Sequence, residues 1–171
     1  QIPEYVNKLC EEIVYTAKIT EKLGLKLDTV YFGGGTPTTL TAAQLDRVMK
    51  VIANNFDMST VREYTVEAGR PDTITEEKLK VLKANGCGRV SINPQTLNDS
   101  VLEAIGRKHT TAQFFDSFDL ARKVGFDSIN TDIIAGLPTD TVESFENTID
   151  KLIELAPETV SYTHLTLPTN S

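Results

Sequence analysis

Four places along the chain carry groups that could hold a small ligand. They are the run Gly33-Gly34-Gly35-Thr36-Pro37 and the side chains Glu67, Gln95 and Asp132. The glycines expose N–H and C=O groups that a ligand can approach closely. The carboxylates, if they lie inside, need hydrogen-bond partners such as an amine or ribose hydroxyls. Together these residues are typical of a site for a ligand with an amino group and hydroxyls, although each one alone also fits a tight turn or a structural acid.

Other polar residues give weaker signals. Arg107 follows Gly106 and could clamp a carboxylate with two parallel hydrogen bonds, but as a lone residue it equally fits a surface charge. His109 and His164 have no partner motif, so we expect no catalytic role for them. The triple glycine also fits a phosphate site, but neither GxGxxG nor GxxxxGK[ST] is present. Because Glu67 and Asp132 would repel phosphate, a phosphate-binding barrel isomerase or lyase is the less favoured alternative.

These residues are positioned by a regular alternation of strands and helices. Apolar spacing predicts a helix over Val6–Ala17 that ends near Gly24, and N-cap residues predict further helices after Thr41, Thr75, Thr110 and Thr141. Five strands are predicted, at residues 29–32, 62–67, 89–93, 128–134 and 159–163. A strand and a helix in every roughly 30 residues indicate βαβ units and a parallel sheet of the α/β class.

The alternation of apolar and polar residues along the strands distinguishes a barrel from an open sheet. In Glu63-Tyr64-Thr65-Val66-Glu67 the apolar residues share one face and the polar residues the other, and residues 89–93 and 129–133 follow the same pattern. A doubly wound sheet has helices on both faces, so its strands are apolar on both. We therefore expect a barrel or partial barrel with a polar interior that holds a ligand, and a site at the carboxyl ends of its strands.

Composition narrows the class of protein. The 171 residues carry 17 basic and 24 acidic side chains, a formal net charge of −7. An acidic chain without basic runs is a poor candidate for nucleic-acid binding, and no apolar run is long enough to span a membrane. Cys10 and Cys87 stand far apart, which fits small buried residues in a reducing compartment, so we expect a cytoplasmic protein.

Four motifs in order carry a resemblance to a known family. They are Tyr31–Thr38 with its GGGTP sequence, Tyr64–Asp72, Ser91–Thr96 and Asn130–Pro138. The chain resembles radical S-adenosylmethionine enzymes of the oxygen-independent coproporphyrinogen III oxidase family over about residues 1–160. The sequences VEAGRPD and SINPQT are similar to the corresponding motifs of the HemZ-type coproporphyrinogen dehydrogenase branch.

The resemblance implies a partial (β/α)6 barrel that binds S-adenosylmethionine beside a [4Fe–4S] cluster. It implies that the backbone of Gly33, Gly34 and Gly35, with Thr36, holds the methionine amino end of the ligand.

The other ligand contacts follow from the same resemblance. The amino and ribose groups would be held by Glu67, Gln95 and Asp132, the carboxylate would meet Arg107, and the turn that begins at Gly136 would shape the adenine pocket. The resemblance assigns no catalytic residue and no metal ligand to this chain.

The implied activity is the radical oxidative decarboxylation of propionate side chains to vinyl groups in haem biosynthesis, with a porphyrinogen as substrate and a monomeric protein. A haem chaperone of the same family, which keeps the same core, is the alternative.

Two features depart from the family pattern. The family's cluster ligands lie in a Cys-x3-Cys-x2-Cys loop, which this chain lacks, so we expect an N-terminally truncated core at residues 1–160 whose first, cluster-binding strand precedes Gln1. By itself such a chain would be inactive. Residues 161–171 do not match the family and are expected to be a non-native or disordered tail.

Overall fold

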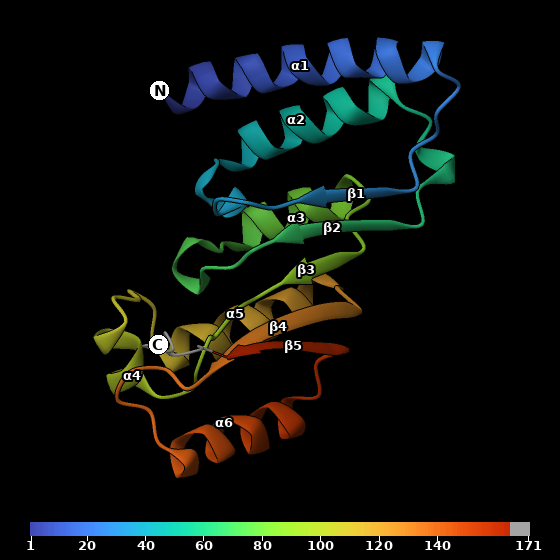
Figure 1. Ribbon diagram of the computed structural model, residues 1–171. Coiled ribbons are helices and arrows are strands. Elements are labelled where there is room, and N and C mark those ends of the chain that lie inside the picture. The colour runs from blue at the N-terminus through green and yellow to red at the C-terminus, as the bar shows by residue number, and fades with distance from the viewer. Residues whose placement is uncertain (165–171) are drawn as a thin grey trace, which may run out of the picture.

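The computed structural model describes residues 1–164, which form one parallel sheet with helices (Figure 1). The five strands lie side by side in chain order, and every neighbouring pair is parallel. Their bounds are β1 Thr29–Phe32, β2 Glu63–Glu67, β3 Arg89–Ser91, β4 Ser128–Ala135 and β5 Thr159–His164. All five carboxyl ends therefore lie at the same edge of the sheet, as the sequence predicts.

Residues 1–164 contain six α-helices and three 3-10 helices, of which α1 precedes β1 and the others connect the strands. The α-helices are α1 Ile2–Lys22, α2 Ala42–Asn55, α3 Glu76–Ala84, α4 Asp99–Ala104, α5 Thr111–Val124 and α6 Val142–Leu155, and the 3-10 helices are η1 Pro37–Thr39, η2 Met58–Thr60 and η3 Pro71–Thr73. Helices α3 and α5 lie behind the sheet in Figure 1, with α1 and α2 beyond β1 and α6 beyond β5. Within residues 1–164, no helix covers the near face of the sheet in this view.

The helices begin where the sequence predicts. In α2 the Thr41 hydroxyl accepts from the Gln44 N–H at 3.2 Å, and the Gln44 side chain accepts from the Thr41 N–H at 2.9 Å. Thr110 and Gln113 form the same reciprocal pair at the start of α5. Such a reciprocal pair is a capping box, and each one provides acceptors for two N–H groups that the first turn of a helix leaves without partners.

The apolar core lies between the helices and one face of the sheet. Val30, Val66, Val90 and Ile129 are each at most 8% exposed and point from their strands toward the helices. The residues that alternate with them face the other side, where polar side chains line a pocket. The predicted division into one apolar and one polar face is therefore confirmed, because alternate side chains of a strand point to opposite faces.

Two elements differ from the prediction. Strand β3 ends at Ser91 instead of residue 93, and parallel pairing with β4 resumes at Gln95, which has a φ of 65°. Pro94 has no N–H to donate, so the ladder is interrupted there. Helix α4 is not among the helices that the sequence predicts, and it begins after Asn98, whose side chain accepts from the N–H groups of Ser100 and Val101.

The C-terminal part of the described chain continues the sheet. Residues 161–164, which the sequence assigns to the tail, pair with β4 through the register Asp132–Ser161 to Ala135–His164. The rest of the expected tail, residues 165–171, lies outside the described residues. Among the helices within residues 1–164, none has the length and apolarity that crossing a membrane would require.

Candidate functional site

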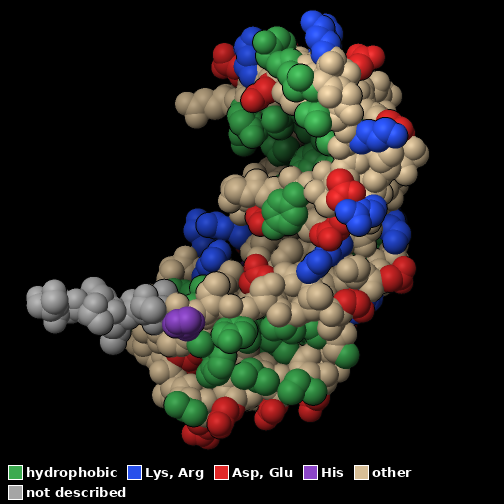
Figure 2. Space-filling view, turned by 45° about the vertical axis from the view of Figure 1, so that its right-hand side comes forward, with side chains coloured by type: hydrophobic (Ala, Val, Ile, Leu, Met, Phe, Trp, Pro, Cys, Tyr) green, Lys and Arg blue, Asp and Glu red, His purple; other side chains and the backbone are tan. Residues whose placement is uncertain are grey.

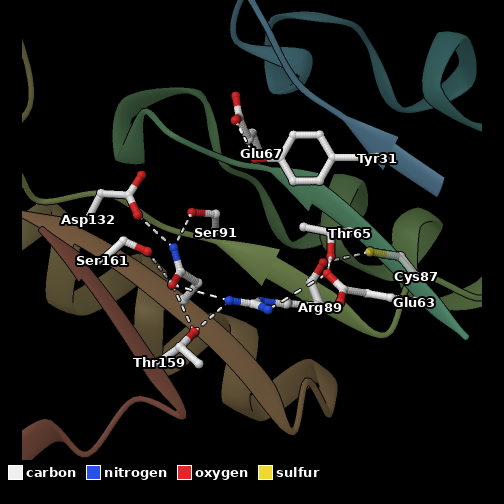
Figure 3. A network of polar contacts seen from close by, with 11 residues as sticks. Tyr31, Glu63, Thr65, Glu67, Cys87, Arg89, Ser91, Asp132, Thr159 and Ser161 are labelled. Carbon is white, nitrogen blue, oxygen red and sulfur yellow. Dashed lines mark hydrogen bonds and ion pairs between the residues drawn. The ribbon is translucent and has the colours of Figure 1, made fainter. Parts of the chain in front are cut away.

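A polar pocket of about 340 Å3 opens on the helix-free face of the sheet. The polar side chains that line it come from all five described strands and from the turn after β3, and they include Tyr31, Glu63, Arg89, Gln95, Asn130 and Asp132. Two of the predicted site residues, Gln95 and Asp132, thus share one pocket. Glu67 lies beside it and contacts Tyr31 at its rim (Figure 3).

Asp132 is held in place by Asn130 from the same strand. The Asn130 side-chain amide donates to the Asp132 carboxylate at 2.7 Å and to the Ser91 hydroxyl at 3.0 Å. Its carbonyl oxygen accepts from the Thr159 hydroxyl at 2.8 Å, which fixes the orientation of the amide (Figure 3). Within residues 1–164 the carboxylate makes no other side-chain hydrogen bond, so it retains acceptor capacity for a ligand.

Arg89 is the one cationic side chain among the pocket-lining residues of the described chain. Its guanidinium donates to the hydroxyl of Thr159 at 2.7 Å and to the carbonyl oxygen of Asn130 at 3.3 Å, and it lies 3.7 Å from the Glu63 carboxylate. Sequence reasoning did not single out Arg89 or Asn130. The signal that could have found them is the polar face of the strands, to which both belong.

Gln95 has side-chain hydrogen-bonding capacity that the described residues leave unused. Its backbone is fixed beside β4, because its N–H donates to the Asp132 carbonyl at 3.0 Å and its own carbonyl accepts from Ile134 at 2.9 Å. Its side chain is 8% exposed and forms no hydrogen bond with another part of residues 1–164. A buried side-chain amide that lies on a pocket wall without a hydrogen-bond partner fits a site in which a polar ligand supplies that partner.

The glycine run provides bare backbone at the end of β1. Gly34 has a φ of 97°, a conformation that favours glycine, and a Cβ at Gly34 or Gly35 would have no atom within 4 Å. Gly33 differs, because a Cβ there would stand 2.4 Å from Tyr31 Cε1 and 3.2 Å from Glu67 Oε1. Only the second and third glycines therefore face open space, and the next residue, Thr36, begins η1 as its N-cap.

Two predicted residues lie outside the polar pocket. Arg107 is half-buried beyond α4, where burial and the nearby Arg70 lower the pKa of its guanidinium, while Asp72 opposes the shift. Gly136 follows β4 with a φ of 72° and is exposed. Gly136 directly follows the carboxyl end of β4, whereas Arg107 lies between α4 and α5, and neither residue lines the pocket.

The two histidines are not brought together. His109 is 3% exposed, and its Nε2 lies 3.2 Å from the Pro94 carbonyl oxygen, whereas His164 ends β5 and is exposed. Since a carbonyl only accepts, the His109 ring nitrogen is the donor. This arrangement is that of a histidine satisfied within the core.

The described residues do not fit an iron–sulfur cluster. Cys10 and Cys87 are free and buried, and burial raises the pKa of the Cys87 thiol to about 12. Residues 1–164 contain no group of three or more His, Cys, Asp or Glu side chains placed to hold a metal ion. The prediction that the thiols behave as small buried residues is confirmed, and a metal ligand role within this part of the chain has no support.

Comparison with known proteins identifies the family to which this arrangement belongs. Residues 1–152 match the model of the Radical SAM superfamily. The oxygen-independent coproporphyrinogen-III oxidase-like protein HemZ of Bacillus subtilis is 45% identical over 138 residues, which are 80% of this chain and 28% of that protein. The heme chaperone HemW of the same organism is 40% identical over 158 residues, 92% of this chain and 41% of the relative.

The fold agrees with a solved structure of the same group. The coproporphyrinogen III oxidase HemN of Escherichia coli, described as a radical SAM enzyme, superposes with a TM-score of 0.86 at 35% identity, over 98% of this chain and 38% of that one. The described sheet therefore covers part of the predicted barrel, and this chain spans between 28% and 41% of the lengths of these three proteins. The superfamily uses S-adenosylmethionine and a [4Fe–4S] cluster, and this chain belongs to the radical SAM superfamily.

Proposed function

We propose that this chain is the S-adenosylmethionine-binding core of an oxygen-independent coproporphyrinogen III oxidase or dehydrogenase. The observation that carries the proposal is that the side chains of Gln95 and Asp132 line the same pocket. The described residues leave part of the hydrogen-bonding capacity of each side chain unused. In a radical SAM protein, that wall is suited to the amino and hydroxyl groups of S-adenosylmethionine.

The charge of the pocket supports a cationic ligand. Glu63 and Asp132 line it and Glu67 lies beside it, whereas Arg89 is the one cation on its wall within the described chain. Three carboxylates against one guanidinium leave the region negative. S-adenosylmethionine carries a sulfonium and an ammonium, so its positive groups meet a complementary field.

For the remaining residues we propose the roles that the resemblance to the family implies. The open backbone at Gly34 and Gly35, together with Gly33 and Thr36, receives the methionine amino end of the ligand. Arg107 binds the carboxylate, and the turn at Gly136 borders the adenine. When bound, the cofactor and its cluster supply a carbon radical, and the protein contributes binding, orientation and exclusion of water.

The cluster belongs, in this proposal, to a segment before Gln1 with a Cys-x3-Cys-x2-Cys loop. An apolar groove of about 580 Å3 lies between α1, the outer edge of β1 and α2, and it includes Tyr5, Leu9, Val30 and Phe32. Figure 2 shows apolar side chains gathered at this end of the molecule. In this proposal a strand that precedes α1 would pair with β1 and cover this groove, and its cysteine loop would lie beside Gly33–Gly35.

A heme chaperone is the second candidate, because HemW proteins are among the relatives at 40% identity and above. The two candidates differ in whether the porphyrin is changed. The phosphate-binding barrel is not favoured by any of these comparisons.

The test is made on the intact, cluster-loaded protein under anaerobic conditions. We expect coproporphyrinogen III to lose carbon dioxide in the presence of S-adenosylmethionine and a reductant, as measured by the product masses. An unchanged porphyrinogen, together with stoichiometric haem binding and transfer to an acceptor protein, would establish the chaperone instead. A lack of S-adenosylmethionine binding in calorimetry would refute both candidates.

A further inference from the structure

Tyr31 lies where the apolar groove beside α1 meets the polar pocket on the sheet face. It is the middle of strand β1 and lines both the apolar groove beside α1 and the polar pocket on the sheet face. The residue is 61% exposed, so it is not part of the core. An exposed aromatic ring at this junction is in a position to contact a ligand or the residues that hold one.

The Tyr31 hydroxyl is committed to Glu67. It donates to Oε1 of the Glu67 carboxylate at 2.5 Å, across from β1 to the end of β2 (Figure 3). This bond, partial burial and the nearby charges of Glu67 and Asp132 raise the pKa of Tyr31 to about 12, and the phenol is protonated and a donor at neutral pH. Glu67 makes no other side-chain hydrogen bond within residues 1–164, which leaves its second oxygen free.

The first glycine of the run makes this geometry possible. A Cβ at Gly33 would stand 2.4 Å from Tyr31 Cε1, closer than real contacts allow. The absence of a side chain at Gly33 is therefore needed for the Tyr31 ring to lie across the strand end and reach Glu67. Open space for a ligand is provided by the next two glycines.

We propose that Tyr31 is a positioning residue that orients the Glu67 carboxylate for the ammonium group of S-adenosylmethionine. The proposal rests on the proposed function. By holding one oxygen, the phenol restricts the rotation of the carboxylate and directs the other oxygen toward the ligand. A hydrogen bond between two accessible side chains adds little to folding stability, because water replaces it readily when it is lost.

The test is a double-mutant cycle in the intact, cluster-loaded protein, with S-adenosylmethionine binding measured by calorimetry. Glu67→Gln is expected to weaken binding about 10- to 100-fold, and Tyr31→Phe about fivefold. In the Glu67→Gln background, Tyr31→Phe should change the affinity less than about twofold, because the residue acts through the carboxylate. Tyr15→Phe, at an exposed tyrosine of α1, is the matched control and should bind like the parent.

A second measurement does not depend on the ligand. The ultraviolet titration of Tyr31, obtained as the difference between the parent and Tyr31→Phe, should show a neutral phenol at roughly pH 11, and Glu67→Gln should shift its ionisation toward the ordinary value near 10. This readout also holds if Tyr31→Phe alone folds poorly in the cluster-loaded form. A Tyr31 that titrates normally in the parent would overturn the proposal.

The outcomes separate this inference from the proposed function. If Glu67→Gln weakens binding while Tyr31→Phe binds like the parent, the positioning role is wrong and the ligand site stands. If Tyr31→Phe weakens binding equally in both backgrounds, Tyr31 contacts the ligand directly and does not position Glu67. If Glu67→Gln leaves binding unchanged, the assigned role of Glu67 fails and the inference fails with it.

Discussion

At the scale of single residues, the site is built from carboxylates that neighbouring side chains hold in one orientation. Asp132 is held by Asn130 and Glu67 by Tyr31, each through one short hydrogen bond. Each acid keeps an oxygen that no side chain within residues 1–164 occupies. Orienting an acceptor before the ligand arrives reduces the ordering cost of binding.

Replacement of Asp132 by Asn tests the ligand role of this acid. The asparagine keeps the shape and an acceptor for Asn130, but it removes the charge that faces the ligand. In the intact, cluster-bearing protein we expect S-adenosylmethionine to bind about 10- to 100-fold more weakly, with little change in melting temperature. The measurement is calorimetry beside a thermal melt.

The control for this change is Glu154→Gln, at an exposed acid on α6, which should alter neither quantity. If Asp132→Asn binds as tightly as the parent, Asp132 is a structural acid. Unfolding of the variant would show that the carboxylate holds the sheet together.

We expect the protein to lose stability below neutral pH because of His109. Burial, with Arg107 and Arg70 nearby, lowers the pKa of its ring, although the bond to Pro94 and the charge of Asp72 oppose the shift. The unfolded chain, with an ordinary histidine pKa near 6.5, then takes up the proton more readily than the folded chain. His109 therefore leaves the free energy of unfolding unchanged above about pH 6.5, and it lowers this free energy increasingly as the pH falls below that value.

Thermal melts between pH 7.5 and 5.5 measure this effect. We expect His109→Gln to flatten the decline, since glutamine can still donate to the Pro94 carbonyl but does not titrate. His164→Gln, at the exposed end of β5, should leave the slope as in the parent. An unchanged slope in His109→Gln would assign the decline to other groups.

At the scale of elements, hydrogen bonds at the helix starts define where the βα units turn. Thr41, the N-cap of α2, comes six residues after the last glycine of the loop, so its capping box fixes the return path of the chain behind the glycine backbone. Figure 1 shows this short connection between β1 and α2. The position of the loop therefore depends on local bonds as well as on the sheet.

Thr41→Ala removes the hydroxyl that accepts from the Gln44 N–H. We expect it to lower the free energy of unfolding by about 1 kcal/mol, as measured by denaturant unfolding followed by circular dichroism. Thr41→Ser keeps the hydroxyl and should remain within a few tenths of a kcal/mol of the parent. Equal losses in both variants would show that the methyl group, and not the cap, is responsible.

At the scale of the whole molecule, the described chain leaves apolar surface at both ends of its sheet. One groove lies beside α1 and β1, and a second of about 540 Å3 lies between α6 and β5, where Ile153 and Tyr162 are each 70% exposed. Figure 2 shows both apolar areas on one side of the molecule, with charged side chains between them. Apolar patches of this kind mark surfaces that are covered by other parts of a protein or by partners.

The 171-residue chain by itself is expected to bind no [4Fe–4S] cluster. Its two thiols are buried, one in α1 and the other before β3, and the raised pKa of Cys87 disfavours the thiolate that ligates iron. After anaerobic reconstitution, iron and sulfide contents should equal those of a Cys10→Ser, Cys87→Ser double variant. A four-iron cluster that the double variant loses would contradict this prediction.

The sequence alone determined the order of the elements, the polar face of the strands and the edge at which the site lies. These features are local: Thr41 and Gln44 cap a helix through bonds three residues apart, and the alternation of Glu63 to Glu67 sets the two faces of β2. Because parallel strands share their carboxyl edge, Glu67, Gln95 and Asp132 had to come near one another.

Only the tertiary structure decided which side chains occupy that edge. The bond from Tyr31 to Glu67 joins residues 36 positions apart, and the bonds around Asn130 join three strands. Gly33 looked like open backbone in the sequence, yet the Tyr31 ring fills the space before it. Side-chain direction and register between strands determine such contacts, and neither is encoded in the spacing of residues along a single strand.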